Sequence, residues 1–542
     1  MSAAGIRRVG TRALLVECQS LDDVLALDAH LAETPLAGQI ERVPAARTLL
    51  LGFDSAHHVA AAGARLPTLA PAPIDADTGR EITIDVVYDG ADLADVADHT
   101  GLSVEAVIAA HTGQHWRAAF GGFAPGFFYM VGDNDRLDVP RRAAPRTAVP
   151  AGAVGLAGHF SAVYPKQSPG GWQLIGRTDA RLWDPTRDSP ALIRAGDRIR
   201  YRAVDTLDDT PADGPASASA TQSDVGGDAG PALCVVDPGL QSLAEDLGRP
   251  GQAHLGVPVS GVADRAAARQ ANRLVGNAPG AAVIETVLGG LVVRAVGEAV
   301  VAASGAPGVL SIEGPHGPRR AETGRPFLLR DAETLTFAAP SHGLRRYLAV
   351  RGGFVVDPVL GSGARDTLSD MGPPPLAAGD TLSIGAADNG HVVGAPEPTT
   401  LAAPPDDGIV RLRVVLGPRA DWFSTATIER FTTTPWRVTQ QSNRIGLRLA
   451  VDGDDQGDDA EPPLPRDATG ELPSEGTVPG AIQVPPAGRP VLFLNDHPVT
   501  GGYPVIAVLI DADRDRAAQL APGAVIQFVA VDADAPHSIE GS

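Results

Sequence analysis

Short runs of alternating apolar and polar residues dominate the chain and predict a structure built mainly from short β-strands. Strand-sized runs occur as ALLVE and TLLLGF near the N-terminus and as PVLFLN, YPVIAVLI and GAVIQFVAV toward the C-terminus. Glycine and proline bound most of these runs, which is typical of strands joined by tight turns. The pattern therefore indicates a mainly β protein.

Helical periodicity is confined to a few segments. Apolar residues recur every three or four positions in LDDVLALDAHLAE (21–33), LADVADHTGLSVEAVIAAH (93–111) and ADRAAARQANRLVG (263–276). Because strand-like runs flank the first segment, we expect a small α+β domain over residues 1–80.

Two kinds of repeat divide the rest of the chain. VPAGAVGLAG (149–158) and PGGWQLIG (169–176) resemble VPGAIQVPPAG (478–488) and TGGYPVIA (500–507), with similar intervals between them. This correspondence predicts that one barrel-like unit is duplicated. A shorter pattern, a glycine followed by an alternating strand, is expected to close each domain; it occurs in IRAGDRIRY (193–201), LAAGDTLSI (376–384) and LAPGAVIQF (520–528).

Polar stretches set the domain boundaries. Residues 204–232 are small, polar and acidic without periodic apolar positions, and we expect a disordered tether there. Residues 452–476 are expected to form an acidic surface loop. The predicted fold is thus mainly β with α+β, as a small N-terminal α/β unit (1–80), barrels at 81–203, 233–385 and 409–535, and linkers at 204–232 and 386–408.

Charge and cysteine content narrow the classes of function. The net charge of −21 and pI ≈ 5.0 disfavour binding to nucleic acid or to an anionic membrane. Cys18 and Cys234 are too few and too distant for a disulfide framework. No signal peptide and no long apolar span is visible, so we expect a cytoplasmic protein.

Glycine and arginine mark a candidate anion site in the first half. Arg142 and Arg146 stand in a proline-punctuated segment suited to recognising carboxylate or phosphate, although solvated charge is an equal alternative. In YPKQSPGGWQLIGRT (164–178), the Gly170 and Gly171 amides could cradle an anion. The polar partners there are Gln173, Arg177 and Lys166, the only lysine of the chain; a glycine-rich turn with a surface lysine is the alternative.

A second group of candidates lies in the other half. Arg249 and Asp264 stand near the start of a predicted helix, where free amides favour anions; the default interpretation of Asp264 is a first-turn acid favourable to the helix dipole. Similar loop positions are occupied by Arg444, Gln483, Asp496, His497 and Thr500.

Several common catalytic motifs are missing from the sequence. It contains no G-x-x-x-x-G-K-[ST] phosphate loop, HExxH, paired CxxC or G-x-S-x-G elbow. His111 and His115 have the spacing of a metal pair but no third ligand, so a helix-surface or core role is favoured. No metal site is expected.

These motifs together resemble a known pair of subunits. The first half resembles the B subunit of 5-oxoprolinase, also labelled allophanate hydrolase subunit 1 and related to a sporulation kinase inhibitor. The second half resembles the C subunit of the same enzyme, and both are similar to the carboxyltransferase part of urea carboxylase. The matching stretches are GGFAPGFFYM, VPRRAAPR, VPAGAVGLAG and YPKQSPGGWQLIGRT in the first half, and VDPGLQSLAEDLGRPG, GVPVSGVADRAAARQANRLVGN, RRYLAVRGGF, GAIQVP and TGGYP in the second.

The resemblance implies cyclophilin-like barrels and an ATP-dependent opening of 5-oxoproline to glutamate, performed with the separate A subunit of 5-oxoprolinase. ATP, with Mg²⁺, would activate the lactam; no covalently bound biotin is expected, and a homo-oligomer is possible. The resemblance places Gln173, Arg177, Arg146 and Asp496 in catalysis. It places Arg142, Gly170, Gly171, Arg249, Asp264, Arg444, Gln483 and Thr500 in substrate or nucleotide binding.

Two alternatives stay open, a carboxyltransferase-like component of a biotin-dependent urea or amide carboxylase and a histidine-kinase regulator. The sequence also departs from the family pattern. Glu245 replaces a glutamine, and GSGARD (361–366) replaces Gly-Ser-Arg-Ser-Thr-Asp. Specificity could differ at these positions. The resemblance also implies that the residue after Tyr-Pro varies, so Lys166 is interpreted as incidental.

Overall fold

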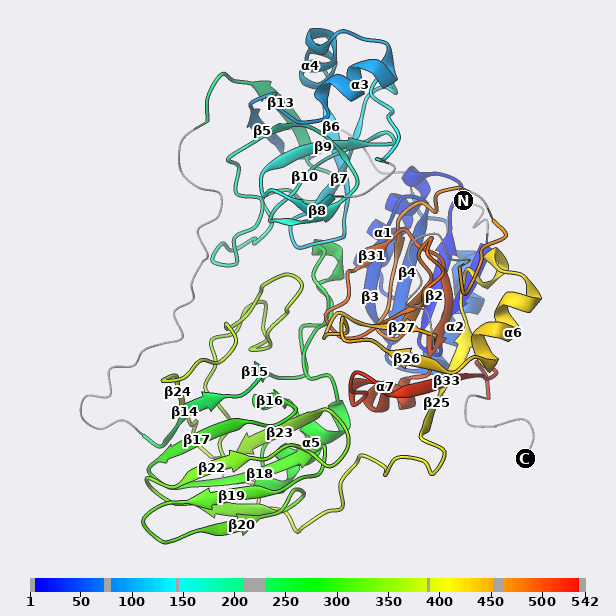
Figure 1. The fold of residues 1–542 in the computed structure, drawn as a ribbon. Helices are drawn as coiled ribbons and strands as arrows, with labels where there is room; N and C mark the ends of the chain where they lie inside the picture. The colour runs from blue at the N-terminus through cyan, green and yellow to red at the C-terminus, as the bar shows by residue number, and fades with distance from the viewer. Residues whose placement is uncertain are drawn as a thin grey trace.

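The computed structural model describes residues 5–72, 79–142, 146–207, 230–387, 390–451, 462–468 and 470–535 (Figure 1). Most of the predicted tether at 204–232 and part of the acidic segment at 452–476 lie outside the described residues. The described chain is mainly β, as predicted, with a small N-terminal α/β unit and two closed or nearly closed barrels.

The N-terminal unit is a four-stranded antiparallel sheet with two helices. Its strand order is β1-β2-β4-β3. The Ser20 hydroxyl accepts a hydrogen bond from the Asp23 amide and so starts the first helix where the sequence predicts it. The elements are β1 (Gly5–Val9), β2 (Ala13–Glu17), α1 (Leu21–Glu33), β3 (Gln39–Pro44), β4 (Thr48–Phe53), α2 (Ala56–Arg65) and η1 (Leu66–Thr68).

Both faces of this sheet are buried, which explains the continuous apolar run in β4. Along β2, Leu14 and Val16 pack under the helices, whereas Ala13 and Leu15 pack against the C-terminal barrel. Side chains alternate between the faces of a strand, so each face meets a different partner. The N-terminal sheet (blue) therefore shares a core with the barrel (orange to red) at the far end of the chain (Figure 1).

The first barrel follows the N-terminal unit. Its strand order is β5-β13-β6-β7-β10-β9-β12, and a bridge between Val87 and Arg177 joins its two ends. The predicted helix at 93–111 is split in two at Gly101, whose φ of +67° ends the first part. The elements are β5 (Glu81–Val86), α3 (Leu93–Thr100), α4 (Val104–Thr112), β6 (Trp116–Gly121), β7 (Phe128–Gly132), β8 (Arg146–Val149), β9 (Ala153–Ala157), β10 (Phe160–Val163), β11 (Ser168–Gly170), β12 (Gln173–Arg177) and β13 (Arg198–Ala203).

The C-terminal barrel repeats this topology strand for strand. Its order, β25-β33-β26-β27-β30-β29-β32, closes in the same sequence, and β33 pairs in parallel with β25 as β13 does with β5. The elements are β25 (Ile409–Leu416), η3 (Ala420–Trp422), α6 (Thr425–Thr433), β26 (Trp436–Val438), β27 (Gly446–Ala450), β28 (Glu475–Gly476), β29 (Ala481–Gln483), β30 (Val491–Phe493), β31 (Thr500–Gly501), β32 (Val505–Leu509), α7 (Asp511–Ala518) and β33 (Val525–Ala530).

Residues 233–385 form two packed sheets instead of the predicted barrel. The orders β20-β19-β22-β17-β14-β24 and β15-β16-β23-β18-β21 share no strand. Strand-sized runs and turns look alike in a sandwich and a barrel, so the sequence pattern could not separate them. The elements are β14 (Ala232–Pro238), β15 (Ser242–Glu245), η2 (Ala253–Leu255), α5 (Arg265–Val275), β16 (Val283–Val287), β17 (Leu291–Val296), β18 (Ala299–Gly305), β19 (Leu310–Glu313), β20 (Arg319–Ala321), β21 (Pro326–Leu329), β22 (Thr334–Phe337), β23 (Arg345–Val350) and β24 (Thr381–Ser383).

The connecting segments are partly packed. Within the predicted linker at 386–408, Glu397 pairs with Arg273 at 2.6 Å and so lies along α5. Within the predicted acidic loop, Leu464 is fully buried in the C-terminal barrel core, because the chain there turns inward. No helix among the described residues is long and apolar enough to cross a membrane.

Because the barrel is duplicated, we expect two equivalent tryptophans to contribute similarly to stability. The indole N–H of Trp116 donates to His111 O at 3.0 Å, and that of Trp436 donates to Phe431 O at 3.0 Å. Either Trp→Phe change leaves a buried carbonyl unpaired, so we expect each to cost about 1–3 kcal/mol of stability. Thermal unfolding should show similar losses of stability for Trp116→Phe and Trp436→Phe and a smaller loss for Trp422→Phe. A loss of stability for only one of the first two variants would contradict the equivalence of the two barrels.

Candidate active site at the junction of the two halves

The glycine-rich loop of the first half docks directly onto the second half. The Phe123 amide donates a hydrogen bond to Thr500 Oγ1 at 2.8 Å. A Cβ atom on Gly122 would lie 2.6 Å from Thr500 Oγ1, and one on Gly256 would lie 2.4 Å from Ala124 O. Only glycine permits such approach, so GGFAPGFFYM is a docking loop, and Thr500 lies at the seam between the halves.

Lys166 also lies at this seam. Its ammonium group donates to the carbonyl oxygen of Leu368, which belongs to the second half. Burial lowers the pKa of Lys166, opposed by the nearby carboxylates of Asp366 and Asp370. The sequence favours an incidental lysine at this position, whereas in the structure Lys166 is half-buried beside the buried Asp366 and the exposed Asp370.

Asp496 and Arg444 form the centre of a buried ionic network between the sandwich and the C-terminal barrel. Arg444 Nε donates to Asp496 Oδ2 at 3.0 Å, and another arm of the guanidinium pairs with Glu285. Asp496 also accepts from the Ser260 hydroxyl at 2.6 Å and the Thr367 hydroxyl at 2.7 Å. Burial alone would raise the pKa of Asp496, but Arg444 and these donors hold it below its ordinary value.

Glu245 also lies in this network, where its Oε1 pairs with Arg444 Nη2 at 3.2 Å. It is fully buried, and burial raises its pKa well above the ordinary value, despite the attraction of Arg444. Among the described residues, both of its carboxyl oxygens are buried without a hydrogen-bond partner.

Arg249 and Asp366 connect Lys166 to this network. Arg249 is 2% exposed, and it donates to the Val359 carbonyl at 3.3 Å and to the Ala364 carbonyl. Burial, reinforced by Asp496, raises the pKa of Asp366 to about 6. Among the described residues, Arg249 Nη1, Asp366 Oδ2 and Ser168 Oγ are buried without a hydrogen-bond partner. Such atoms are the ones that a bound ligand or water would satisfy.

Arg142 and Arg146 lie apart from this network and clamp one carboxylate. Both pair with the buried Asp92, Arg146 at 2.7 Å, and Asp92 also accepts from the Leu174 amide at 2.7 Å. The clamp fixes the start of β12, where the Gln173 side-chain amide donates to Pro140 O at 3.1 Å and its Oε1 has no partner among the described residues.

The other predicted residues have separate surroundings. Gly170 packs against the Tyr164 ring, and the Gly171 carbonyl accepts from the Arg142 amide at 2.8 Å. Arg177 is 56% exposed and pairs with Asp89 at 2.9 Å. Gln483 donates to Tyr503 O at 3.1 Å, beside β31.

Asp264 has the helix-capping role that the sequence left open. Its Oδ1 accepts from the Ala267 amide at 2.9 Å, and its Oδ2 accepts from Gln519 at 2.7 Å. Burial raises the pKa of Asp264 to about 7, so it ties α5 to the C-terminal barrel mainly by hydrogen bonding.

Sequence comparison assigns both halves to one domain family. Residues 255–530 match the carboxyltransferase domain, subdomain A and B, and residues 4–193 match the carboxyltransferase domain, subdomain C and D. The chain belongs to the carboxyltransferase domain family.

Relatives of this carboxyltransferase-domain protein include two separate subunits of one enzyme. The C subunit of 5-oxoprolinase from Escherichia coli (strain K12) is 35% identical over 300 residues, 55% of this chain and 90% of that protein. The B subunit of 5-oxoprolinase from Escherichia coli O157:H7 is 50% identical over 125 residues, 22% of this chain and 57% of that protein. The chain thus fuses units that resemble these two proteins.

One solved structure resembles nearly the whole carboxyltransferase-domain chain. The crystal structure of TTHA0988 has a TM-score of 0.80 and 34% identity, and the match covers 96% of this chain and 99% of that one. The arrangement of both halves, and not only the separate modules, therefore has a crystallographic counterpart.

Sequence reasoning missed Lys166 and Asp366 as members of one site. Asp366 is the last residue of GSGARD, the segment that departs from the family pattern. Its place in the site depends on its proximity to Lys166, which lies 200 residues earlier in the chain. The single lysine of an arginine-rich chain was the signal that could have marked this place, but nothing local tells which loop it meets.

Breaking the network should destabilise the protein strongly. Asp496→Asn removes a charge that compensates the buried Arg444, so we expect a loss of about 3–5 kcal/mol. The matched control is Asp407→Asn, which breaks an exposed pair with Arg411 at 2.7 Å and should cost less than about 1 kcal/mol. Equal losses in thermal or denaturant unfolding would contradict the assigned role.

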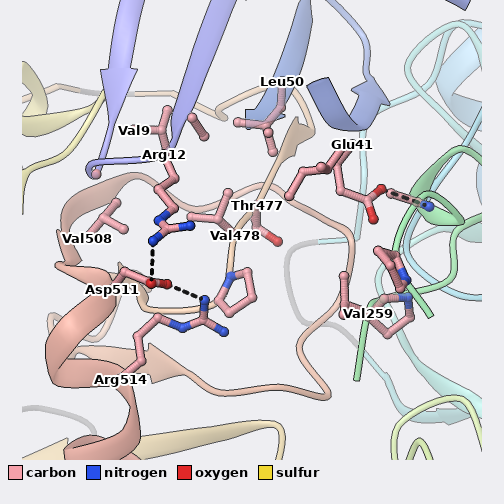
Figure 2. Close-up of a pocket in the computed structure, with 18 of the residues that line it drawn as sticks. Val9, Arg12, Glu41, Leu50, Val259, Thr477, Val478, Val508, Asp511 and Arg514 are labelled. Carbon is pink, nitrogen blue, oxygen red and sulfur yellow. Dashed lines mark hydrogen bonds and ion pairs between the residues drawn. The ribbon is translucent and has the colours of Figure 1, made fainter. Parts of the chain in front are cut away.

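Glu41 gives a pH-dependent test of the contact between the N-terminal sheet and residues 251–253. Its carboxylate accepts from the Gly251 and Ala253 amides, and burial raises its pKa to about 7 from 4.5 (Figure 2). Glu41 ionises near pH 4.5 in the unfolded chain but only near pH 7 in the folded protein. The free energy of unfolding therefore falls as pH rises from 4.5 to 7, and the full cost is present above pH 7.

We therefore expect Glu41→Gln to match the wild type near pH 4.5 and to exceed its stability by up to about 3 kcal/mol at pH 8. Unfolding midpoints measured across this range provide the test. A gain that is constant with pH, or a loss at pH 8, would contradict the raised pKa of Glu41.

Proposed function

We propose that this chain supplies the fused B and C components of an ATP-dependent 5-oxoprolinase, which opens 5-oxo-L-proline to L-glutamate with a separate A component. One observation carries the proposal. Units that resemble two separate 5-oxoprolinase subunits meet at a seam containing buried polar atoms that lack partners among the described residues. A site completed by both halves explains why two such units would be joined in one chain.

The chemistry needs positive charge beside a lactam carbonyl. ATP, when bound, supplies a phosphoryl group that turns the poor leaving oxygen of an amide into a good one. Lys166 and Arg249 lie near Asp366, and Arg249 Nη1 is free to donate among the described residues. We propose that these two cations stabilise the negative charge that develops as the ring opens.

The remaining predicted residues take supporting roles in this proposal. Asp496 and Arg444 fix the loops that carry Thr367 and Thr500, and the Arg142–Asp92–Arg146 clamp positions Gln173. Arg177, Gln483 and Asp264 have contacts outside the network, and we assign them no chemical step. For Mg²⁺, we propose entry with the nucleotide phosphates.

A second candidate is the carboxyltransferase step of a biotin-dependent carboxylase acting on urea or a related amide. The domain family of both halves favours it. In that case another chain would carry the biotin.

The test is turnover with the cognate A component. We expect purified protein, the A component, ATP and 5-oxoproline to yield glutamate and ADP together, and no glutamate when either protein or ATP is omitted. Urea, supplied with a biotin carboxylase and biotin carrier, tests the second candidate. Absence of glutamate with a folded, bound A component would overturn the proposal.

Substitutions at the seam test which residues take part in this reaction. We expect Lys166→Gln and Asp366→Asn each to lower kcat/KM by about 10–100-fold, because each removes charge at the seam. Arg320→Gln is the matched control, since Arg320 is exposed on β20 of the sandwich and should retain wild-type turnover. Full activity of Lys166→Gln would remove this lysine from the reaction.

A further inference from the structure

A cavity lies where the N-terminal sheet, the sandwich and the C-terminal barrel meet (Figure 2). Its volume is ≈ 270 Å³. For comparison, an apolar cavity of about 150 Å³ accommodates benzene, so this one has room for a single ring with a substituent. None of the residues placed in the seam chemistry above, Lys166, Arg249 or Asp366, lines it.

One wall of the cavity is aliphatic. Val9, Val43 and Leu50 come from the N-terminal sheet, and Val478 and Val508 come from the C-terminal barrel. Figure 2 shows Val9 and Leu50 on one side of the cavity, with Val478 and Val508 facing them. The apolar part of a ligand could therefore contact hydrophobic side chains on two sides.

The lining of the cavity also carries an excess of positive charge. Arg12 pairs with Asp511 at 3.1 Å, and Arg514 pairs with the same carboxylate at 3.2 Å. Arg265 and Arg269 line the cavity as well, whereas Glu41 and Asp511 are the only carboxylates among its described lining residues. Four guanidinium groups therefore face two acids.

Arg265 comes from the start of α5. Burial lowers its pKa to about 10, against the attraction of Asp511 and Asp515, and its backbone amide donates to Asp515 Oδ1 at 2.9 Å. His497, another lining residue, has its pKa lowered by burial to about 4 and adds no charge at neutral pH. The lining therefore presents more cations than carboxylates to a bound molecule.

We propose that this cavity binds a small organic carboxylate, with its apolar body against Val478 and Leu50 and its carboxylate against Arg265 and Arg514. Planar guanidinium groups recognise a carboxylate through paired hydrogen bonds, which favours this head group. The apolar wall excludes a simple inorganic anion as the best occupant, because such an ion would leave that wall unmatched. This inference does not depend on the proposed function.

The test uses benzoate as the probe, with benzyl alcohol and inorganic phosphate as comparisons, by titration calorimetry on the full chain alone. We expect benzoate to bind at least about tenfold more tightly than either comparison, because only benzoate satisfies both walls. The same titration with 5-oxoproline asks whether this ring carboxylate uses the cavity. Failure of 5-oxoprolinase turnover would leave this result unaffected.

Three variants test whether benzoate binds in this cavity. We expect Arg265→Gln to weaken benzoate binding at least about tenfold and Val478→Trp to abolish it by filling the cavity, with Arg320→Gln as the unchanged control. Circular dichroism checks that each variant is folded. Benzoate no tighter than benzyl alcohol, phosphate equal to benzoate, or benzoate binding that survives Arg265→Gln unchanged would each overturn the proposal.

Discussion

The ion pair between Arg444 and Asp496 is the interaction on which the rest of the site depends. Both groups are almost completely buried, and a buried charge is tolerated only when partners replace its lost hydration. Asp496 takes donors from Ser260 and Thr367 of the sandwich as well as from Arg444 of the barrel. Separating these modules would leave charges unpaired in an apolar interior, so the ion pair fixes their relative position. The loop that follows Asp496 then presents Thr500 to the first half of the chain.

The duplicated barrel explains how two halves of a chain come to face each other across one seam. Each barrel carries the same circular strand order, and the N-terminal sheet buries its second face on the C-terminal barrel. The first half therefore contacts the second through this sheet, through the docking loop at Gly122 and through Lys166. Charged side chains of the first half, such as Lys166, can then complete a network built in the second half.

The features that could be predicted from the sequence are those that depend on local pattern. Strand-sized runs, the helix starting at Leu21 and the repeat between 149–176 and 478–507 all correspond to observed elements, because periodicity and turn residues act over short distances. The sandwich at 233–385 differs from the predicted barrel, because closure depends on which distant strands pair. The same dependence on distant contacts decides which candidate residues lie together. Asp496, Arg444 and Arg249 share a network, whereas Arg177 pairs at the surface. The contact of Lys166 with residue 368 joins loops remote in sequence, and no local signal encodes it.

The two halves form one body, and the candidate site lies along their seam. A protease site inserted between residues 204 and 232 would allow the purified chain to be cut there, and size-exclusion chromatography would then report whether the parts stay together. The account predicts a single peak at the position of the uncut chain, because the shared core and the docking loop hold the halves without a covalent link. Two peaks with the sizes of the separate halves at micromolar concentration would contradict it.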